Sequence, residues 1–489
     1  MAEGISRRTF VGGVLAATVV GFDTHLRSWV TARELSRRGR ALAADLPAFK
    51  GALLTDEAAL DAAADDFGHL VHRRPMAVLL PASVHDILTL VRFARRHHLH
   101  VAARGQGHST QGQAQADAGV VIDLATLADI YEVNASDALV DGGVRWVDLL
   151  QQTLPLGLTP PTLTDFLELS VGGTLTVGGL GGQAFHWGPQ IENVSELQVV
   201  TGRGTLVTCS PRERPDLFHA VRAGLGQFGI IVSARVRLID APPHVRLYQA
   251  RYHHLSAFLA GLERVIDDGR FDTVQGSALP DGAGSWQVLW ETTKYFMPGA
   301  EPDDAALWAG LAFTPGTAST QDLPYFEYIN RLAPLVARLR ESGVWFVPHP
   351  WVNLFVPAPQ ALAFIGDALA QLTVDDVGGG PVLINPYNRD RFRAPFCRVP
   401  DSRHFFNFGL LRNAIPPTQE RADALIQANR RLFEQVTALG GKRYPVDAVP
   451  MGQHDWRHHF QPMWEAFVAA KQRFDPDHIC TPGQGIFEA

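Results

Sequence analysis

A single histidine, His108, stands inside a cluster of small residues in the stretch ARGQGHSTQGQAQA, at positions 103–116. Its small neighbours are Gly105, Gly107, Ser109 and Gly112. Glycines this close together let backbone N–H groups approach a phosphate or a cofactor ring. The pattern is not a dinucleotide-binding fingerprint, because Thr110 stands where the third glycine belongs. The loop is a candidate cofactor site, and a polar surface loop is the alternative.

A second glycine-rich region, LTPPTLTDFLELSVGGTLTVGGLGGQAFHWGPQ, covers residues 158–190. Six of its glycines fall within eleven residues, Gly172, Gly173, Gly178, Gly179, Gly181 and Gly182. Because so many glycines would destabilise a helix or strand, close backbone approach explains them, with a flexible loop as the alternative. Asp165, just before these glycines, and Glu168 have the spacing of a helix capping box.

The elements around these loops alternate between strand and helix. Met76–Leu80 predicts a strand that ends at Pro81, and an amphipathic helix follows Ser83. Strands are predicted on either side of the His108 loop, at His100–Ala103 and Gly119–Leu124. This order indicates an α+β or α/β domain. Further elements are a hairpin at Asn193–Thr208, helices at Leu255–Ile266, Pro359–Leu372 and Thr418–Leu439, and strands at Trp286–Phe296 and His404–Leu411.

Length and composition limit the class of protein. A chain of 489 residues is too long for one hydrophobic core, so two or three domains are expected. The net charge of −7 gives no reason to expect nucleic acid as a partner. Three widely spaced cysteines form neither a metal pattern nor a disulfide framework. His454 and His458 have helical spacing but lack a third ligand, so no metal is expected.

The N-terminus resembles a twin-arginine export signal, because Ser6-Arg7-Arg8-Thr9-Phe10 precedes the apolar run Val11–Phe22. That run is too short for a stable membrane span. We therefore expect an exported protein, secreted or periplasmic, with cleavage left open near Ala41–Ala43. A basic tail ahead of a buried helix is the alternative.

Four motifs together resemble one family. They are R-G-x-G-H-S followed by G-Q-A at Arg104–Ala114, T-D-x-L-x-L-x-V-G-G-T-L at Thr164–Leu175, G-Q-A-F-x-x-G-P-Q at Gly182–Gln190, and V-P-H-P-W-x-N-x-F at Val347–Phe355. The chain is similar in these motifs to FAD-linked oxidases of the vanillyl-alcohol oxidase (PCMH) type, and most similar to the cytokinin dehydrogenases.

The resemblance implies an α+β fold with a discontinuous FAD-binding domain and an α+β substrate (cap) domain over the flavin. We predict a signal and linker at 1–45, the FAD-binding domain at 46–243, the cap domain at 244–440 and a return segment at 441–489. The change of composition at Pro242-Pro243 marks the first boundary of the cap domain.

The resemblance also assigns roles to residues. It implies FAD bonded covalently to His108, Asp165 as the catalytic base, and Trp351 and Asn353 against the substrate, although Trp351 could equally be a core residue. We expect a single covalent attachment, because the second glycine-rich region has no cysteine before Cys209. The predicted cofactor-binding set is Arg104, Gly105, Gln106, Gly107, His108, Ser109, Gln113, Asp165, Gly172, Gly173, Gly178, Gly182, Ile230 and Gln484, where Gln113 and Gln484 could also be ordinary loop amides.

The expected reaction is oxidation of the side-chain CH–NH bond of an N6-substituted adenine to an imine, which hydrolyses to adenine and an aldehyde. The electron acceptor is oxygen or a quinone-like molecule. Three departures from the family leave the substrate open: the segment Tyr444–Ala448, a helix at Leu332–Arg340 without its acidic residue, and Val177 in place of an asparagine. The alternatives are an FAD-linked oxidase of a CH–OH substrate and a catalytically silent flavin- or ligand-binding protein. The sequence does not set the oligomeric state.

Overall fold

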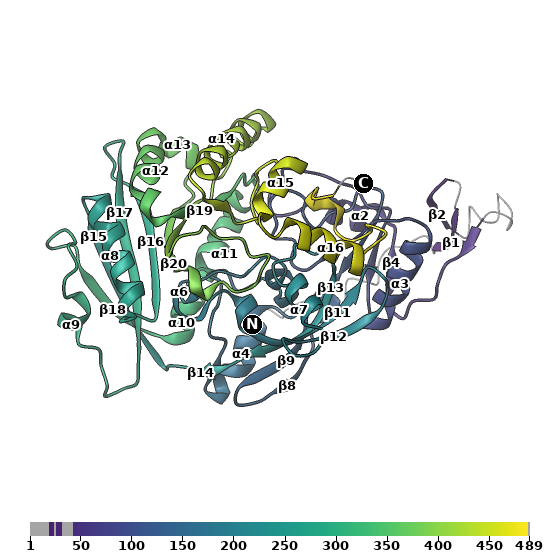
Figure 1. The fold of residues 1–489 in the computed structure, drawn as a ribbon, viewed down its shortest axis with the longest axis horizontal. Coiled ribbons are helices and arrows are strands. Elements are labelled where there is room, and N and C mark those ends of the chain that lie inside the picture. The colour runs from purple at the N-terminus through teal and green to yellow at the C-terminus, as the bar shows by residue number, and fades with distance from the viewer. Residues whose placement is uncertain (1–18, 24–25, 32–42, 488–489) are drawn as a thin grey trace.

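The computed structural model describes residues 19–23, 26–31 and 43–487 (Figure 1). The paired arginines of the predicted export signal lie outside these residues. Within them, no helix is both long and apolar enough to cross a membrane. The last part of the apolar run forms a strand in a small sheet of order β2-β1-β3, with bounds β1 Val19–Asp23, β2 Ser28–Thr31 and β3 Ala43–Asp45. Phe22 of this sheet is buried against Trp29 and Phe93.

A four-stranded sheet carries the His108 loop. Its order is β4-β5-β7-β6, with bounds β4 Ala52–Leu54, β5 Ala77–Leu80, β7 Val120–Asp123 and β6 Val101–Arg104. The parallel strands β5, β7 and β6 are joined through α3 (Val84–Arg96), and α2 (Glu57–Ala64) precedes β5. The loop leaves the end of β6 and returns to β7. The strands and helix predicted here are confirmed, with α3 burying Ile87, Val91 and Ala94.

A five-stranded antiparallel sheet lies beside the first, in the order β12-β11-β13-β9-β8. Its strands are β8 Ile130–Val133, β9 Asp137–Asp141, β11 Val194–Thr201, β12 Leu206–Cys209 and β13 Gly229–Arg237. The helices of this region are α4 Trp146–Thr153, α5 Val171–Leu175, α6 Ala184–Trp187 and α7 Pro215–Val221. A short ladder pairs β10 (Leu158–Thr159) with β14 (Ile239–Asp240). The predicted hairpin is β11–β12.

The third large sheet has eight strands, all antiparallel, in the order β18-β15-β17-β16-β20-β21-β19-β22 (Figure 1). The strands are β15 His244–Tyr252, β16 Thr273–Pro280, β17 Trp286–Phe296, β18 Ser319–Pro324, β19 Val352–Pro357, β20 Val382–Asn388, β21 His404–Leu410 and β22 Lys442–Arg443. The helices between them are α8 Leu255–Asp268, α9 Asp304–Trp308, α10 Tyr325–Ile329, α11 Ala333–Glu341, α12 Ala358–Gln371, α13 Val374–Val377 and α14 Gln419–Ala438.

The last part of the chain returns to the first two sheets. Its helices are α15 (Gln453–Phe460) and α16 (Trp464–Phe474), drawn in yellow in Figure 1, and α16 packs on α7. Beyond α16, Cys480 bridges to Val101 at the start of β6. The buried Lys471 ammonium pairs with Asp475 at 2.8 Å and donates to the carbonyl of Gln227 at 3.0 Å. The end of the chain is thereby fixed beside the start of β6 and the loop that holds Gln227, and the predicted two-domain α+β fold is confirmed. The exact domain limits stay a prediction.

Candidate active site

A cavity of about 830 Å³ runs between the four- and five-stranded sheets on one side and the eight-stranded sheet on the other. Its floor comes from the His108 loop, the second glycine-rich region, residues 225–231 and the C-terminal residues Thr481 and Gln484. The opposite wall comes from the eight-stranded sheet and from α11. This volume lies within the range of about 300–1,000 Å³ that is usual for small-molecule and cofactor sites.

A buried carboxylate, Asp66, holds the His108 loop in place. One of its oxygens accepts hydrogen bonds from the Ser109 hydroxyl at 2.9 Å and from the Gly112 N–H at 2.6 Å, and the other accepts from Gly68. Burial raises the pKa of Asp66 to about 6, although the bonds from Gly112 and Ser109 oppose that shift. These hydrogen bonds hold the backbone of the loop against Asp66.

His108 lines the cavity and is surrounded by aromatic rings. Its ring centre lies 4.1 Å from that of Phe67, 4.8 Å from Phe166 and 5.7 Å from Trp351. Burial, assisted by the nearby His349, lowers the pKa of His108 to about 3. The imidazole is therefore uncharged near neutral pH, and its nitrogen lone pair is free to react.

Asp165 lies at the boundary between the floor and the opposite wall. Its Oδ2 accepts a hydrogen bond from Gln275 Nε2 at 2.8 Å, and its Oδ1 accepts from Arg331 Nη2 at 2.8 Å. No helix begins at Asp165, since residues 163–169 form turns and bends. The capping-box interpretation is therefore wrong, and the carboxylate faces the cavity.

Arg331 connects Asp165 to a second carboxylate. Its Nε lies 3.6 Å from Glu291 Oε1, its Nη2 donates to Gln275 Oε1 at 2.7 Å, and its guanidinium stacks on Tyr328 at 4.4 Å. Burial alone would lower the pKa of Arg331, but the neighbouring Tyr328, Asp165 and Glu291 raise it. Arg331 is therefore a fixed positive charge between two carboxylates in the cavity wall.

Polar side chains form a row across five neighbouring strands of the eight-stranded sheet, and all of them line the cavity. The row consists of Gln249 on β15, Glu291 on β17, Gln275 on β16, Asn385 on β20 and Asn407 on β21. Its members are cross-strand partners at 249–291, 291–275 and 385–407. The Gly276 N–H donates to Asn385 Oδ1 at 3.1 Å and joins the two parts of the row. We call these five residues the polar row.

Most of the predicted site residues line this cavity, namely Gly105, Gln106, Gly107, His108, Ser109, Gln113, Asp165, Gly172, Gly173, Ile230, Trp351, Asn353 and Gln484. Three predicted residues do not line it: Arg104, Gly178 and Gly182. The Arg104 side chain turns back to the carbonyl of Asp65 beneath Gly107. Gly178 packs on Tyr444, and Gly182 packs on Thr273 and Gln275, so these two glycines allow protein segments rather than a ligand to approach closely.

Sequence reasoning missed Arg331, Glu291 and Gln275. Glu291 lies on β17 and Gln275 on β16, and only the pairing of these two strands brings them together. Arg331 follows α10 and reaches the site only when that helix packs against β15. No local spacing in the sequence indicates this cluster.

The residues of the cavity fit FAD. Glycines in two loops leave backbone groups accessible, and an uncharged imidazole lies beside them. Three cavity-lining residues have a buried polar atom that no described residue satisfies: Ser170 Oγ, Trp351 Nε1 and Asn407 Oδ1. Among the described residues, no group of three or more His, Cys, Asp or Glu side chains is placed to hold a metal ion.

Comparisons with known proteins agree with this geometry. The profile described as "FAD binding domain" matches residues 75–210, and the one described as "Cytokinin dehydrogenase 1, FAD and cytokinin binding" matches residues 288–487. An uncharacterised oxidoreductase of the fasciation locus of Rhodococcoides fascians is 41% identical over 88% of this chain and 97% of its own length. Cytokinin dehydrogenase 5 of rice is 38% identical, with 87% of this chain and 89% of the relative covered. Cytokinin dehydrogenase 4 of Arabidopsis thaliana is 35% identical, with 89% and 92% covered.

The fold and the cavity define an FAD-dependent oxidoreductase with a substrate domain over the flavin. Within that class, the chain belongs to the cytokinin dehydrogenase family. The predicted fold, the enzyme class and FAD as the cofactor are thereby confirmed, and the covalent link to His108 stays a prediction.

Proposed function

We propose that this enzyme oxidises the CH–NH bond of an N6-substituted adenine, giving an imine that hydrolyses to adenine and an aldehyde. The observation that carries the proposal is Asp165, which is fixed by Gln275 and Arg331 where the floor of the cavity meets the polar row. Each carboxylate oxygen has a second lone pair, so Asp165 can also accept a hydrogen bond from the substrate N–H. FAD, when bound, supplies the acceptor for the hydride.

The residues of this chain then have defined tasks. Asp165 accepts the proton from the amine nitrogen as the carbon–hydrogen bond is broken. Arg331 holds that carboxylate in one orientation. The amides of the polar row can donate and accept in a plane along the sheet, which suits the alternating donors and acceptors of a purine ring. Trp351 provides a large flat surface beside Asn353 at the other side of the site.

The test is an assay with an adenine that carries an allylic N6 side chain. Substrate should bleach the flavin of the wild-type protein under anaerobic conditions, and Asp165→Asn should slow bleaching about 10²–10⁴-fold, the usual contribution of a general base. The flavin absorption of the variant should be unchanged. Bleaching by an alcohol or sugar but not by the amine would contradict the proposed substrate. Bleaching by neither would indicate a protein without this chemistry.

We further propose that FAD is attached covalently through His108. The support is an imidazole in the cavity that is uncharged at neutral pH, next to glycines that leave room for the flavin ring. After denaturation in acid, the yellow chromophore should stay with the wild-type chain and leave His108→Ala. The exposed His186, outside the cavity, provides the matched control, since His186→Ala should keep the chromophore. Release from the wild type would contradict the attachment and leave the FAD site intact.

We also propose export through the twin-arginine-like N-terminus, which rests on the sequence pattern alone. Oxygen or a quinone-like molecule is the proposed electron acceptor. Replacing Arg7 and Arg8 by lysine should keep the protein in the cytoplasm of a host that has the export system. Export of that variant at the wild-type level would contradict the signal.

A further inference from the structure

A second hollow lies outside the FAD cavity, along the segment that follows β20. It has a volume of about 650 Å³, within the range of small-molecule sites. We call it the arginine groove, because its lining includes Arg389, Arg391, Arg393, Arg398 and Arg403. Such a concentration of positive charge contrasts with the net charge of −7 of the whole chain.

The carboxylates around the groove do not balance these arginines. Two of the described acidic residues line it, Asp267 and Asp390. Arg403 forms an ion pair with Asp267 at 2.6 Å, and Arg391 Nε lies 3.7 Å from Asp390. Arg389 lies 3.1 Å from the highly exposed Asp401. Among the described residues, no carboxylate forms an ion pair with Arg393 or Arg398. Two guanidinium groups are therefore left without a counter-charge.

The Arg398 side chain is partly buried, although none of the described carboxylates forms an ion pair with it. Its Nη1 and Nη2 donate to the carbonyls of Pro395 and Gln461, at 3.1 and 3.0 Å. Its Nε is buried without a hydrogen-bond partner among the described residues, as is the Nε of Arg391. Burial, reinforced by the charge of Arg389, lowers the pKa of Arg398. A buried charge without a partner is costly, and an anion in the groove would relieve that cost.

The backbone of the groove is fixed in advance. Glu192 Oε1 accepts hydrogen bonds from the N–H groups of Arg393 at 2.8 Å and Ala394 at 2.6 Å. Asn388 Nδ2 donates to the carbonyls of Phe185 and Ile266. A ligand would therefore not have to order this segment, which favours affinity.

We propose that the arginine groove binds a small organic phosphate. A phosphomonoester carries nearly two negative charges and has three acceptor oxygens, which matches two unpaired guanidinium groups, those of Arg393 and Arg398. The groove is also much larger than one phosphate group. Its apolar lining residues Ile266, Phe392, Pro395 and Val399 provide the contact surface for the organic part.

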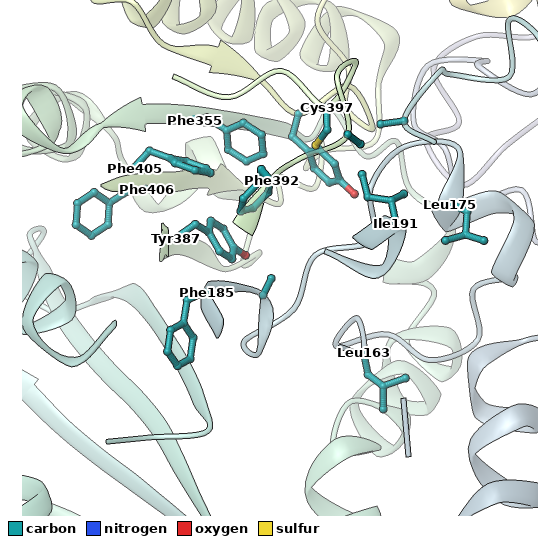
Figure 2. Close-up of a cluster of buried hydrophobic side chains, with 14 of the residues drawn as sticks. Leu163, Leu175, Phe185, Ile191, Phe355, Tyr387, Phe392, Cys397, Phe405 and Phe406 are labelled. Carbon is teal, nitrogen blue, oxygen red and sulfur yellow. The ribbon is translucent and has the colours of Figure 1, made fainter. Parts of the chain in front are cut away.

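The groove is separated from the FAD cavity by a layer of aromatic rings. Tyr387, near the end of β20, lines the FAD cavity, and its ring centre lies 5.6 Å from that of Phe392 in the groove. Figure 2 shows Phe392 among Phe355, Phe405 and Tyr387, close to Cys397. A ligand in the groove would therefore be distinct from both flavin and amine substrate.

The test is calorimetric titration of the flavin-loaded protein with phenyl phosphate, inorganic phosphate and phenol. Phenyl phosphate should bind, and inorganic phosphate should bind at least about tenfold more weakly. The heat measured with phenol should be the same for the wild type and for the groove variants. Arg393→Gln should weaken phenyl phosphate about tenfold or more, the loss expected for a charge-assisted contact. Arg431→Gln, an exposed arginine on α14 outside the groove, should bind as the wild type does.

Arg393 is exposed, and its side chain donates one hydrogen bond to a described residue, at the carbonyl of Asp390, so its replacement should leave the fold intact. Arg398→Lys, which keeps the charge and changes its geometry, should also weaken binding. Absence of binding to the wild type would overturn the proposal, as would equal binding by Arg393→Gln and Arg431→Gln. Equal affinity for inorganic and phenyl phosphate would overturn the assignment to organic phosphates.

Discussion

Both carboxylate oxygens of Asp165 accept a hydrogen bond, one from Gln275 and one from Arg331. For a base in such a position, the rate of proton transfer depends more on how firmly the carboxylate is oriented than on its intrinsic basicity. Arg331 also neutralises Glu291, which would otherwise face Asp165 across the cavity wall without a positive charge between them. At the scale of single residues, the pair Asp165–Arg331 is the smallest unit that can perform the proposed proton transfer.

Replacing Arg331 therefore gives a prediction at this scale. Arg331→Gln should lower kcat/KM for the amine about 10- to 100-fold, which corresponds to the loss of a hydrogen bond to a charged group. Steady-state kinetics with the amine substrate measure this effect.

The matched control is Arg338→Gln, an exposed arginine on the nearby helix α11 that has no ion pair with a described residue. It should leave kcat/KM unchanged. Equal kcat/KM values for Arg331→Gln and Arg338→Gln would contradict the role given to Arg331.

At the scale of elements, local patterns in the sequence were sufficient for many boundaries. Trp286–Phe296 was predicted as a strand and is β17, and the predicted helix Leu255–Ile266 is α8 extended to Asp268. Alternation and helical periodicity are local signals, and the side chains that carry them are close together in the chain.

The polar row could not be predicted in this way. Its members lie at positions 249, 275, 291, 385 and 407, and only the strand order of the finished sheet makes them neighbours. For the same reason, the glycine Gly182 was placed against the cofactor, whereas its closest neighbours are Thr273 and Gln275 of β16. The motifs around His108 and Asp165 were informative because one short segment carries each of them.

The support behind the His108 loop gives a pH prediction at the scale of elements. His349 stacks on Phe67 with ring centres 4.1 Å apart, and Phe67 in turn contacts His108. Burial lowers the pKa of His349 from 6.5 to about 4. Between these two pH values the unfolded chain binds a proton that the folded chain does not bind, so stability falls as pH falls through this window.

We expect His349 to contribute up to about 3 kcal/mol to this pH-dependent loss, mostly between pH 6.5 and 4. His349→Phe, which keeps the stacking, should flatten the dependence of the unfolding free energy on pH. His253→Phe, at an exposed position with no hydrogen bond or ion pair to a described residue, is the matched control. Urea unfolding at several pH values measures the slope, and an unchanged slope in His349→Phe would contradict the burial argument.

At the scale of the whole molecule, the end of the chain joins parts that are distant in sequence. The Lys471–Asp475 pair on α16 is almost completely buried, and Lys471 also donates to the carbonyls of Gln227 and Cys480. Asp475 accepts from the N–H groups of Ile479 and Cys480. One buried ion pair thus connects the loop after α7, the helix α16 and the segment that leads back to the cavity.

Removing one partner of a buried pair leaves an uncompensated charge, so Lys471→Met should lower the unfolding free energy by about 3–5 kcal/mol. Arg473→Met on the same helix breaks the exposed pair with Asp216 and should cost no more than about 1 kcal/mol. Chemical denaturation of both variants measures the difference. Equal losses of unfolding free energy would show that the buried pair stabilises the fold no more than the exposed pair does.

The polar row also bears on how this protein could be changed by design. Because side chains on a strand alternate between faces, its five positions face the cavity while the residues next to them face the layer of α8 and α12. A combinatorial library confined to these five codons would therefore vary the wall that faces the electron donor and leave the flavin-side loops untouched. Selection from such a library offers a short route to oxidases for other donor molecules.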